Sequence, residues 1–190
     1  MEATDLGRIA VVGSGSVGLF YGGRLAASGA DVHFLMRSGF DEARERGIRV
    51  YSPELGDIRI EHPKAFLEPH EIGPCDLVII SLKTTANDSL ETLLPPLLLE
   101  KTALITLQNG LGNEEHLAGL HGAERVLGGL CLVRLTRRTP ASVDHFGHGM
   151  LSIGEFARTP LPRTRRIVDA FCQSGIDAKL VRNLATERWR

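Results

Sequence analysis

The stretch IAVVGSGSVG, residues 9–18, decides the fold. A short β-branched run leads directly into a Gly-x-Gly-x-x-Gly motif, and apolar residues then recur at helical spacing over residues 17–28. Gly29 ends this helix, and residues 31–36 return to an extended apolar pattern. Because a helix connects the two strands, they must pair in parallel, so residues 9–36 are predicted to form one βαβ unit.

The three glycines of the motif have separate physical roles. The first allows a tight turn, the second lets a diphosphate approach the backbone, and the third lets helix and strand pack closely. The N-terminus of the following helix offers free N–H groups to the anion. Between a strand and a helix, the motif predicts a dinucleotide cofactor. The residues predicted to bind it are Gly13, Ser14, Gly15, Ser16, Val17 and Gly18.

Which dinucleotide binds depends on the end of the second strand. An acidic side chain there would accept a hydrogen bond from the ribose 2′-hydroxyl and would repel a 2′-phosphate. This sequence instead has Arg37 and Ser38, which offer a guanidinium fork and a hydroxyl group. The pair predicts NADP rather than NAD as the cofactor. The alternative is that Arg37 is a loop cation without a ligand.

The rest of the chain continues the alternation of strands and helices. Strands are predicted at residues 48–60 (a short pair), 75–82, 102–107 and 125–132, and helices at residues 85–94 and 113–120. The runs at residues 75–82 and 102–107 are almost wholly apolar, which is typical of strands buried on both faces. The predicted fold class is therefore α/β, a Rossmann-type doubly wound sheet that is mainly parallel.

The second half of the chain predicts an antiparallel edge for this sheet. Residues 134–140 are polar and basic and predict an exposed loop, and residues 142–153 predict an antiparallel edge hairpin. A helix at residues 163–174 and a strand at residues 176–182 follow, and a last helix begins at Ala185. No role is assigned to the basic residues of the loop, Arg134, Arg137 and Arg138.

Composition excludes several classes of partner. The 190 residues include 22 basic and 23 acidic side chains, so no overall charge favours nucleic acid or an anionic membrane. No apolar stretch reaches the roughly 18 residues of a membrane helix. The three cysteines are odd in number and widely spaced, which suits reduced thiols and a cytoplasmic location. His145 and His148 lack a third ligand, so no metal site is predicted.

Three further motifs make the pattern much more specific. SLKT at residues 81–84 follows one central strand, QNGLGNE at residues 108–114 follows the next, and residues 144–154 read DHFGHGMLSIG. With the glycine motif, these residues make the chain resemble the ketopantoate reductase (2-dehydropantoate 2-reductase) family. The resemblance is to the family's N-terminal NADP-binding domain and extends over nearly all 190 residues.

This resemblance implies an NADPH-dependent oxidoreductase that transfers hydride to a 2-oxo acid, reducing ketopantoate to pantoate in pantothenate synthesis. It implies that Lys83 contacts the cofactor or stabilises negative charge beside it, and that Asn109 contacts both cofactor and substrate. Both residues follow central strands, at the edge where open α/β sheets bind ligands. The alternatives are a snorkelling surface lysine and an ordinary Asn-Gly turn.

Members of the family continue into an all-helical second domain. The resemblance divides this chain into an NADP-binding domain at residues 1–183 and the first turns of a truncated helix at residues 184–190. By the family's register the general-acid lysine would follow Arg190, so no catalytic residue is predicted within the chain. We therefore expect weak NADPH binding, little or no reduction of ketopantoate, and possible homo-oligomerisation through exposed apolar surface.

Two other functions stay open. The protein could reduce a different 2-oxo acid, since the second domain would supply most of the substrate contacts. It could also be a stand-alone NADP-binding sensor or the subunit of a partner, which a natural stop codon after Arg190 would favour.

Overall fold

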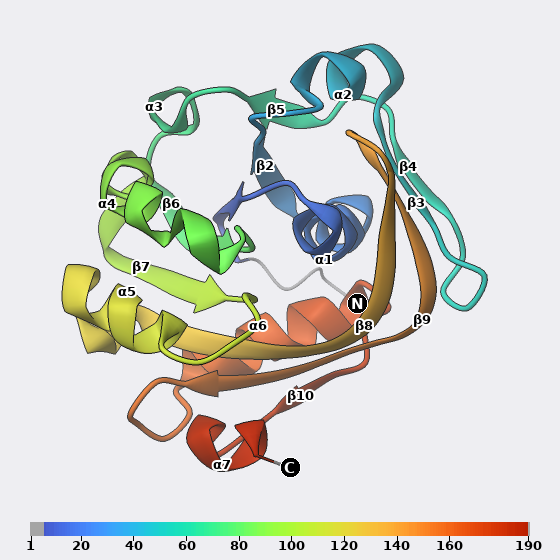
Figure 1. The fold of residues 1–190 in the computed structure, drawn as a ribbon. Helices are drawn as coiled ribbons and strands as arrows, with labels where there is room; N and C mark the ends of the chain where they lie inside the picture. The colour runs from blue at the N-terminus through green and yellow to red at the C-terminus, as the bar shows by residue number, and fades with distance from the viewer. Residues whose placement is uncertain (1–5, 190) are drawn as a thin grey trace.

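The computed structural model describes residues 6–189. Its first elements are β1 (Arg8–Val12), α1 (Ser16–Ala27) and β2 (Asp31–Leu35), and β1 and β2 pair in parallel (Figure 1). The predicted βαβ unit is thus confirmed. Every residue of β1 after Arg8 is buried, which is why an unbroken apolar run forms this strand.

One sheet runs through the molecule in the order β4-β3-β9-β8-β7-β6-β1-β2-β5, with β10 paired to β9. Its other strands are β3 (Ile48–Tyr51), β4 (Ile58–Ile60), β5 (Lys64–Phe66), β6 (Cys75–Ile80), β7 (Leu98–Thr106), β8 (Val126–Thr139), β9 (Ser142–Glu155) and β10 (Ala178–Leu180). The strands from β5 to β8 pair in parallel, whereas β8–β9 and β3–β4 are antiparallel. The predicted fold class, a mainly parallel sheet with an antiparallel edge, is confirmed.

The strand order reverses beside β1. The chain first builds outward from β1 to β2 and β5, and then returns to place β6, β7 and β8 on the other side of β1. In open α/β sheets, ligands bind at such a reversal, outside the carboxyl ends of the strands. The fold therefore positions a ligand site near the carboxyl ends of β1 and β6.

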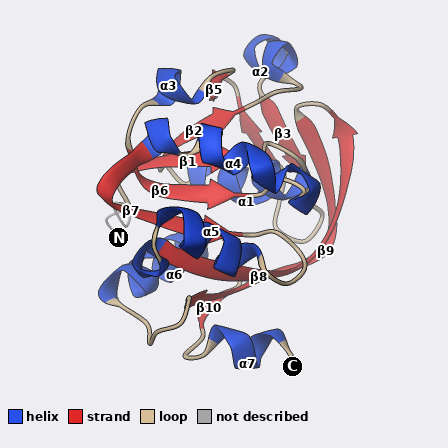
Figure 2. Ribbon diagram, turned by 60° about the vertical axis from the view of Figure 1, so that its left-hand side comes forward, coloured by secondary structure: helices blue, strands red, loops and turns tan. Residues whose placement is uncertain are grey.

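Helices cover both faces of the sheet (Figure 2). The α-helices after α1 are α2 (Phe40–Arg46), α3 (Pro69–Ile72), α4 (Leu90–Leu93), α5 (Asn113–His121), α6 (Pro162–Gln173) and α7 (Leu184–Arg188), and the 3-10 helices are η1 (Thr84–Ser89), η2 (Pro95–Leu97) and η3 (Ala123–Arg125). In β1, Ile9 and Val11 belong to an apolar cluster with α1 and α6, whereas Ala10 and Val12 belong to another with α3, α4 and α5. Within residues 6–189 no helix is both long and apolar enough to cross a membrane.

Two local predictions are wrong. The segment at residues 85–94 is not one helix but η1 followed by a single turn, α4. There the Ser89 hydroxyl donates to the Ala86 carbonyl at 2.6 Å, the kind of local bond that competes with regular helix. The loop predicted at residues 134–140 is instead strand through Thr139, because Leu135 packs on the core while Arg134 is exposed, the alternation of a strand.

A third local prediction, an antiparallel edge hairpin at residues 142–153, is also wrong, because these residues lie in the single strand β9, which forms a long antiparallel hairpin with β8. β9 pairs with β8 on one side and with β3 on the other, and β4 is the outer strand. Figure 1 shows β8 and β9 passing α1, and the turn that joins the two strands lies near α2. The turn between β8 and β9 therefore lies beside the segment that follows β2.

His145 on β9 makes stability depend on pH. Its ring is 1% exposed and lies 4.6 Å, centroid to centroid, from that of Phe20, and Nδ1 is 2.8 Å from the Ser52 hydroxyl. Burial lowers the pKa of His145 from its usual 6.5, so the unfolded chain takes up the proton first. We expect full stability above about pH 6.5 and a loss of up to about 1.4 kcal/mol per pH unit below it.

Chemical denaturation between pH 7.5 and 5.5 checks this expectation. The variant His145→Gln should lose less stability over that range than the parent, and His148→Gln, a change at an exposed histidine on the same strand, should follow the parent. A pH profile of His145→Gln that matches the parent's would contradict the assignment.

Candidate cofactor site

All the residues predicted to bind the cofactor lie in segments that follow parallel strands. The glycine motif follows β1, Arg37 and Ser38 follow β2, Lys83 follows β6 and Asn109 follows β7. Since β2, β1, β6 and β7 are neighbours running the same way, their carboxyl ends meet at one edge of the sheet. The fold thus gathers at this edge segments that are far apart in the sequence.

Two glycines of the motif are required by the fold itself. Gly13 has a φ of 99°, and a Cβ there would lie 2.6 Å from the Leu82 nitrogen. A Cβ on Gly18 would lie 2.5 Å from the Ser81 hydroxyl and closer still to the Gly13 carbonyl oxygen. These positions hold the turn against β6 and the first turn of α1 against β1, which leaves no room for a side chain.

Gly15 is different, because the fold does not require it. Its φ of −80° suits any residue, and a Cβ there would meet no atom within 4 Å. Gly15 is the N-cap of the 12-residue helix α1, no side chain caps the helix, and its first turn contains no acidic residue. A diphosphate group fits these residues, since an open space faces helix N–H groups that carry partial positive charge.

Hydrogen bonds fix the loops of this edge to one another. The Ser81 hydroxyl donates to the Gly13 carbonyl at 2.6 Å, which ties the segment after β6 to the glycine motif. The Ser14 hydroxyl donates to the Leu35 carbonyl at 3.0 Å, which ties the motif to the end of β2. The glycine loop is therefore held from both sides before any ligand binds.

A chain of amide side chains continues this network to Asn109. Gln108 donates from Nε2 to the Leu82 carbonyl at 3.0 Å and to Asn87 Oδ1 at 2.8 Å. Asn87 donates to Asn113 Oδ1 at 3.1 Å, and Asn113 donates to the Asn109 carbonyl at 3.1 Å. No role could be predicted for Gln108, Asn87 or Asn113, since an amide side chain in a loop has no spacing that identifies its partner.

The polar side chains predicted to contact the cofactor are exposed along this edge: Arg37, Ser38, Lys83 and Asn109. Within residues 6–189 neither Arg37 nor Lys83 forms a salt bridge. Both cations are thus available to an anionic ligand. Ser38 also has a partner that no sequence pattern indicated, the guanidinium group of Arg137 on β8.

Helix α7 contacts the loop after β7, which carries Asn109. Arg188 donates to the Gly110 carbonyl at 2.6 Å and pairs with the carboxylate of Glu114. Burial raises the pKa of Glu114 above its usual range, and the charge of Arg188 partly offsets that effect. The loop that carries Asn109 is therefore held at two adjacent carbonyls, that of Asn109 by Asn113 and that of Gly110 by Arg188.

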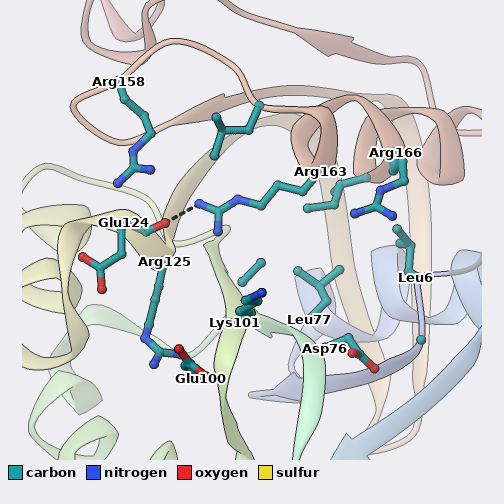
Figure 3. Close-up of a pocket in the computed structure, with 14 residues that line it drawn as sticks. Leu6, Asp76, Leu77, Glu100, Lys101, Glu124, Arg125, Arg158, Arg163 and Arg166 are labelled. Carbon is teal, nitrogen blue, oxygen red and sulfur yellow. Dashed lines mark hydrogen bonds between the residues drawn. The ribbon is translucent and has the colours of Figure 1, made fainter.

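A pocket of about 670 Å³ lies at the opposite edge of the sheet (Figure 3). It is lined at the amino ends of the strands by Asp76 and Leu77 of β6 and, on α6, by Arg163 and Arg166. Arg163 is already paired with the buried carboxylate of Glu155 at 2.6 Å. None of the predicted site residues lines this pocket, so its location does not agree with a site for the predicted cofactor.

Comparison with known proteins agrees with the geometry of the carboxyl edge. The family model described as ketopantoate reductase PanE/ApbA matches residues 9–158, which include every residue predicted to bind the cofactor. The chain belongs to this family. A 2-dehydropantoate 2-reductase from Nostoc sp. is 32% identical over 188 residues, a match that covers 96% of this chain and 59% of that protein.

Solved structures of the ketopantoate reductase family have the same fold. The crystal structure of 2-dehydropantoate 2-reductase from Geobacter metallireducens has a TM-score of 0.92 and 44% identity, covering 96% of this chain and 60% of that one. A ternary structure of D-mandelate dehydrogenase, with 20% identity and a TM-score of 0.79, shares the fold alone. The chain thus spans about 60% of the length of the 2-dehydropantoate 2-reductases it matches.

Proposed function

We propose that the whole protein reduces ketopantoate to pantoate with NADPH, a step of pantothenate synthesis, and that residues 1–183 form its NADP-binding domain. The observation that carries the proposal is the open space at Gly15, the N-cap of α1. The same edge of the sheet carries Arg37 and Lys83, and neither cation forms a salt bridge within residues 6–189. Membership of the ketopantoate reductase family supports the reaction class, since relatives covering nearly all of this chain bear the name 2-dehydropantoate 2-reductase.

Each residue of the carboxyl edge has a distinct part in this proposal. The first turn of α1 binds the diphosphate through backbone N–H groups, and Arg37 with Ser38 binds the 2′-phosphate. Lys83 places a positive charge beside the cofactor, and Asn109, whose side chain both donates and accepts, contacts the cofactor and the substrate. The nicotinamide cofactor, when bound, supplies the hydride.

Direct titration tests the cofactor assignment. We expect the chain to bind NADPH more tightly than NADH, and Arg37→Ala to weaken NADPH binding by about ten- to a hundredfold while changing NADH binding little, because a charge-assisted pair with the phosphate is lost. Isothermal titration calorimetry of the parent chain and of Arg37→Ala, each with NADPH and with NADH at one moderate ionic strength, measures these affinities. Equal loss for the two nucleotides would show that Arg37 does not recognise the 2′-phosphate.

Substrate reduction is proposed of the whole protein. By the register that the family resemblance implies, we propose that the general acid is a lysine that would follow Arg190, and Arg190 itself lies outside the described residues. Loss of a general acid typically removes a factor of about 10² to 10⁴ in rate. We therefore expect these 190 residues to bind the cofactor but to reduce ketopantoate barely or not at all, as measured by NADPH oxidation.

A further inference from the structure

The tip of the β8–β9 hairpin is packed against the loop that follows β2. Arg137 donates from Nη2 to the Pro140 carbonyl at 2.6 Å, and the same nitrogen lies 3.3 Å from the Ser38 hydroxyl and 3.5 Å from the Ser38 carbonyl. Gly39 has a φ of 89°, and a Cβ there would collide with the Pro140 carbonyl. Thr139 donates to the carboxylate of Glu42 in the first turn of α2.

These contacts bring a second guanidinium group to the loop of Arg37. Ser38 is 99 residues from Arg137 in the sequence, but it is adjacent to Arg37, which is proposed to bind the 2′-phosphate. Within residues 6–189, Arg137 forms no salt bridge. Its positive charge is therefore not neutralised by a carboxylate at short range.

The hydrogen bonds of Arg137 involve only one of the three nitrogen atoms of its guanidinium group. All three bonds in the described part of the chain involve Nη2, which leaves the donors of Nε and Nη1 for a ligand. The bond to Pro140 orients the group without neutralising it. Arg138 differs, because it is paired with Asp144 at 2.7 Å and lies over the ring of Tyr51.

We propose that Arg137 is a specificity-determining residue that binds the 2′-phosphate of NADPH together with Arg37. The phosphate would lie between two arginines from distant segments, with the Ser38 hydroxyl between them. Two guanidinium groups match a dianionic phosphate better than one, and planar N–H forks suit its oxygens. This inference rests on the proposed function, because it concerns how the same site distinguishes NADPH from NADH.

Replacement of Arg137 tests the proposal through binding. Arg137→Ala should weaken NADPH binding by about ten- to a hundredfold and leave NADH binding within about twofold, because NADH lacks the phosphate. Arg137→Lys should restore part of the affinity, since it keeps the charge but not the fork. Arg138→Ala is the matched control on the same hairpin and should leave the ratio of NADPH to NADH affinity unchanged.

NADH serves as the internal check on folding, because it needs the same glycine loop. If Arg137→Ala weakens both nucleotides equally, the residue only holds the hairpin in place, and the inference is wrong. It is also wrong if the parent prefers NADPH and Arg137→Ala keeps that preference, although the proposed function would then stand. If the parent binds neither nucleotide, both the inference and the proposed function fail.

Discussion

Replacement of Gly15 by valine is expected to abolish cofactor binding while leaving the fold in place. The φ of −80° at Gly15 suits valine, and a Cβ there meets no protein atom within 4 Å, so the free protein has room for the side chain. The same side chain would fill the space that the diphosphate needs. Loss of even two charge-assisted bonds to backbone N–H groups corresponds to more than a hundredfold in affinity.

Two measurements on Gly15→Val separate binding from stability. Calorimetric titration should detect at least a hundredfold loss in NADPH affinity, whereas chemical denaturation should show a change of about 1 kcal/mol or less, the size expected for an N-cap residue. Gly119→Val is the control, since Gly119 in α5 also has open space around it but lies away from the glycine loop. NADPH binding to Gly15→Val within tenfold of the parent would rule out the diphosphate site.

Replacement of Arg163 by methionine is expected to have the largest effect on stability. The carboxylate of Glu155 is fully buried and accepts bonds from Arg163 Nε at 3.0 Å, Arg163 Nη2 at 2.6 Å and the Thr164 hydroxyl at 2.5 Å. Without the arginine, a buried charge would lose its partner. Breaking such a pair costs about 3–5 kcal/mol, and we expect Arg163→Met to lower the free energy of unfolding by this amount.

Urea denaturation of three variants tests the role of this pair. Arg166→Met changes an exposed arginine on the same helix, beside the same pocket, and should alter stability by about 0.5 kcal/mol or less (Figure 3). The double variant Glu155→Met with Arg163→Met should recover much of the loss, because no unpaired charge remains. If Arg163→Met is no more destabilising than Arg166→Met, the pair contributes little.

The parts of the fold that local chemistry determines could be predicted from the sequence. The β1–α1–β2 unit depends on an apolar run, a glycine turn and a helical repeat within 30 residues or so, and all three were visible in the sequence. The location of Lys83 and Asn109 followed as well, because parallel strands bring their carboxyl ends together. The strand at residues 134–139 was missed, because its arginines suggested a loop and concealed the alternation with Val133 and Leu135.

The contacts between distant segments could not be predicted. Nothing local to Arg137 indicates that it meets Ser38, because the contact depends on the pairing of β9 with β3 and on the length of the hairpin. The same is true of Arg188 and Gly110, which lie 78 residues apart. A single sequence indicates which side chains are able to bind an anion, whereas the packing of the sheet decides which of them lie together.

The wrapping of the β8–β9 hairpin has a consequence for synthesis on the ribosome. The glycine motif and α1 are translated early. However, Tyr21 of α1 packs edge-on against Phe171 of α6, and Ser38 contacts Arg137, so both contacts need segments that are translated much later. Until those later segments have been translated, the part of α1 around Tyr21 lacks its native cover, and such exposed apolar surface promotes aggregation of nascent chains. The part of the sheet that carries the glycine motif is therefore translated first but reaches its native packing only near the end of translation.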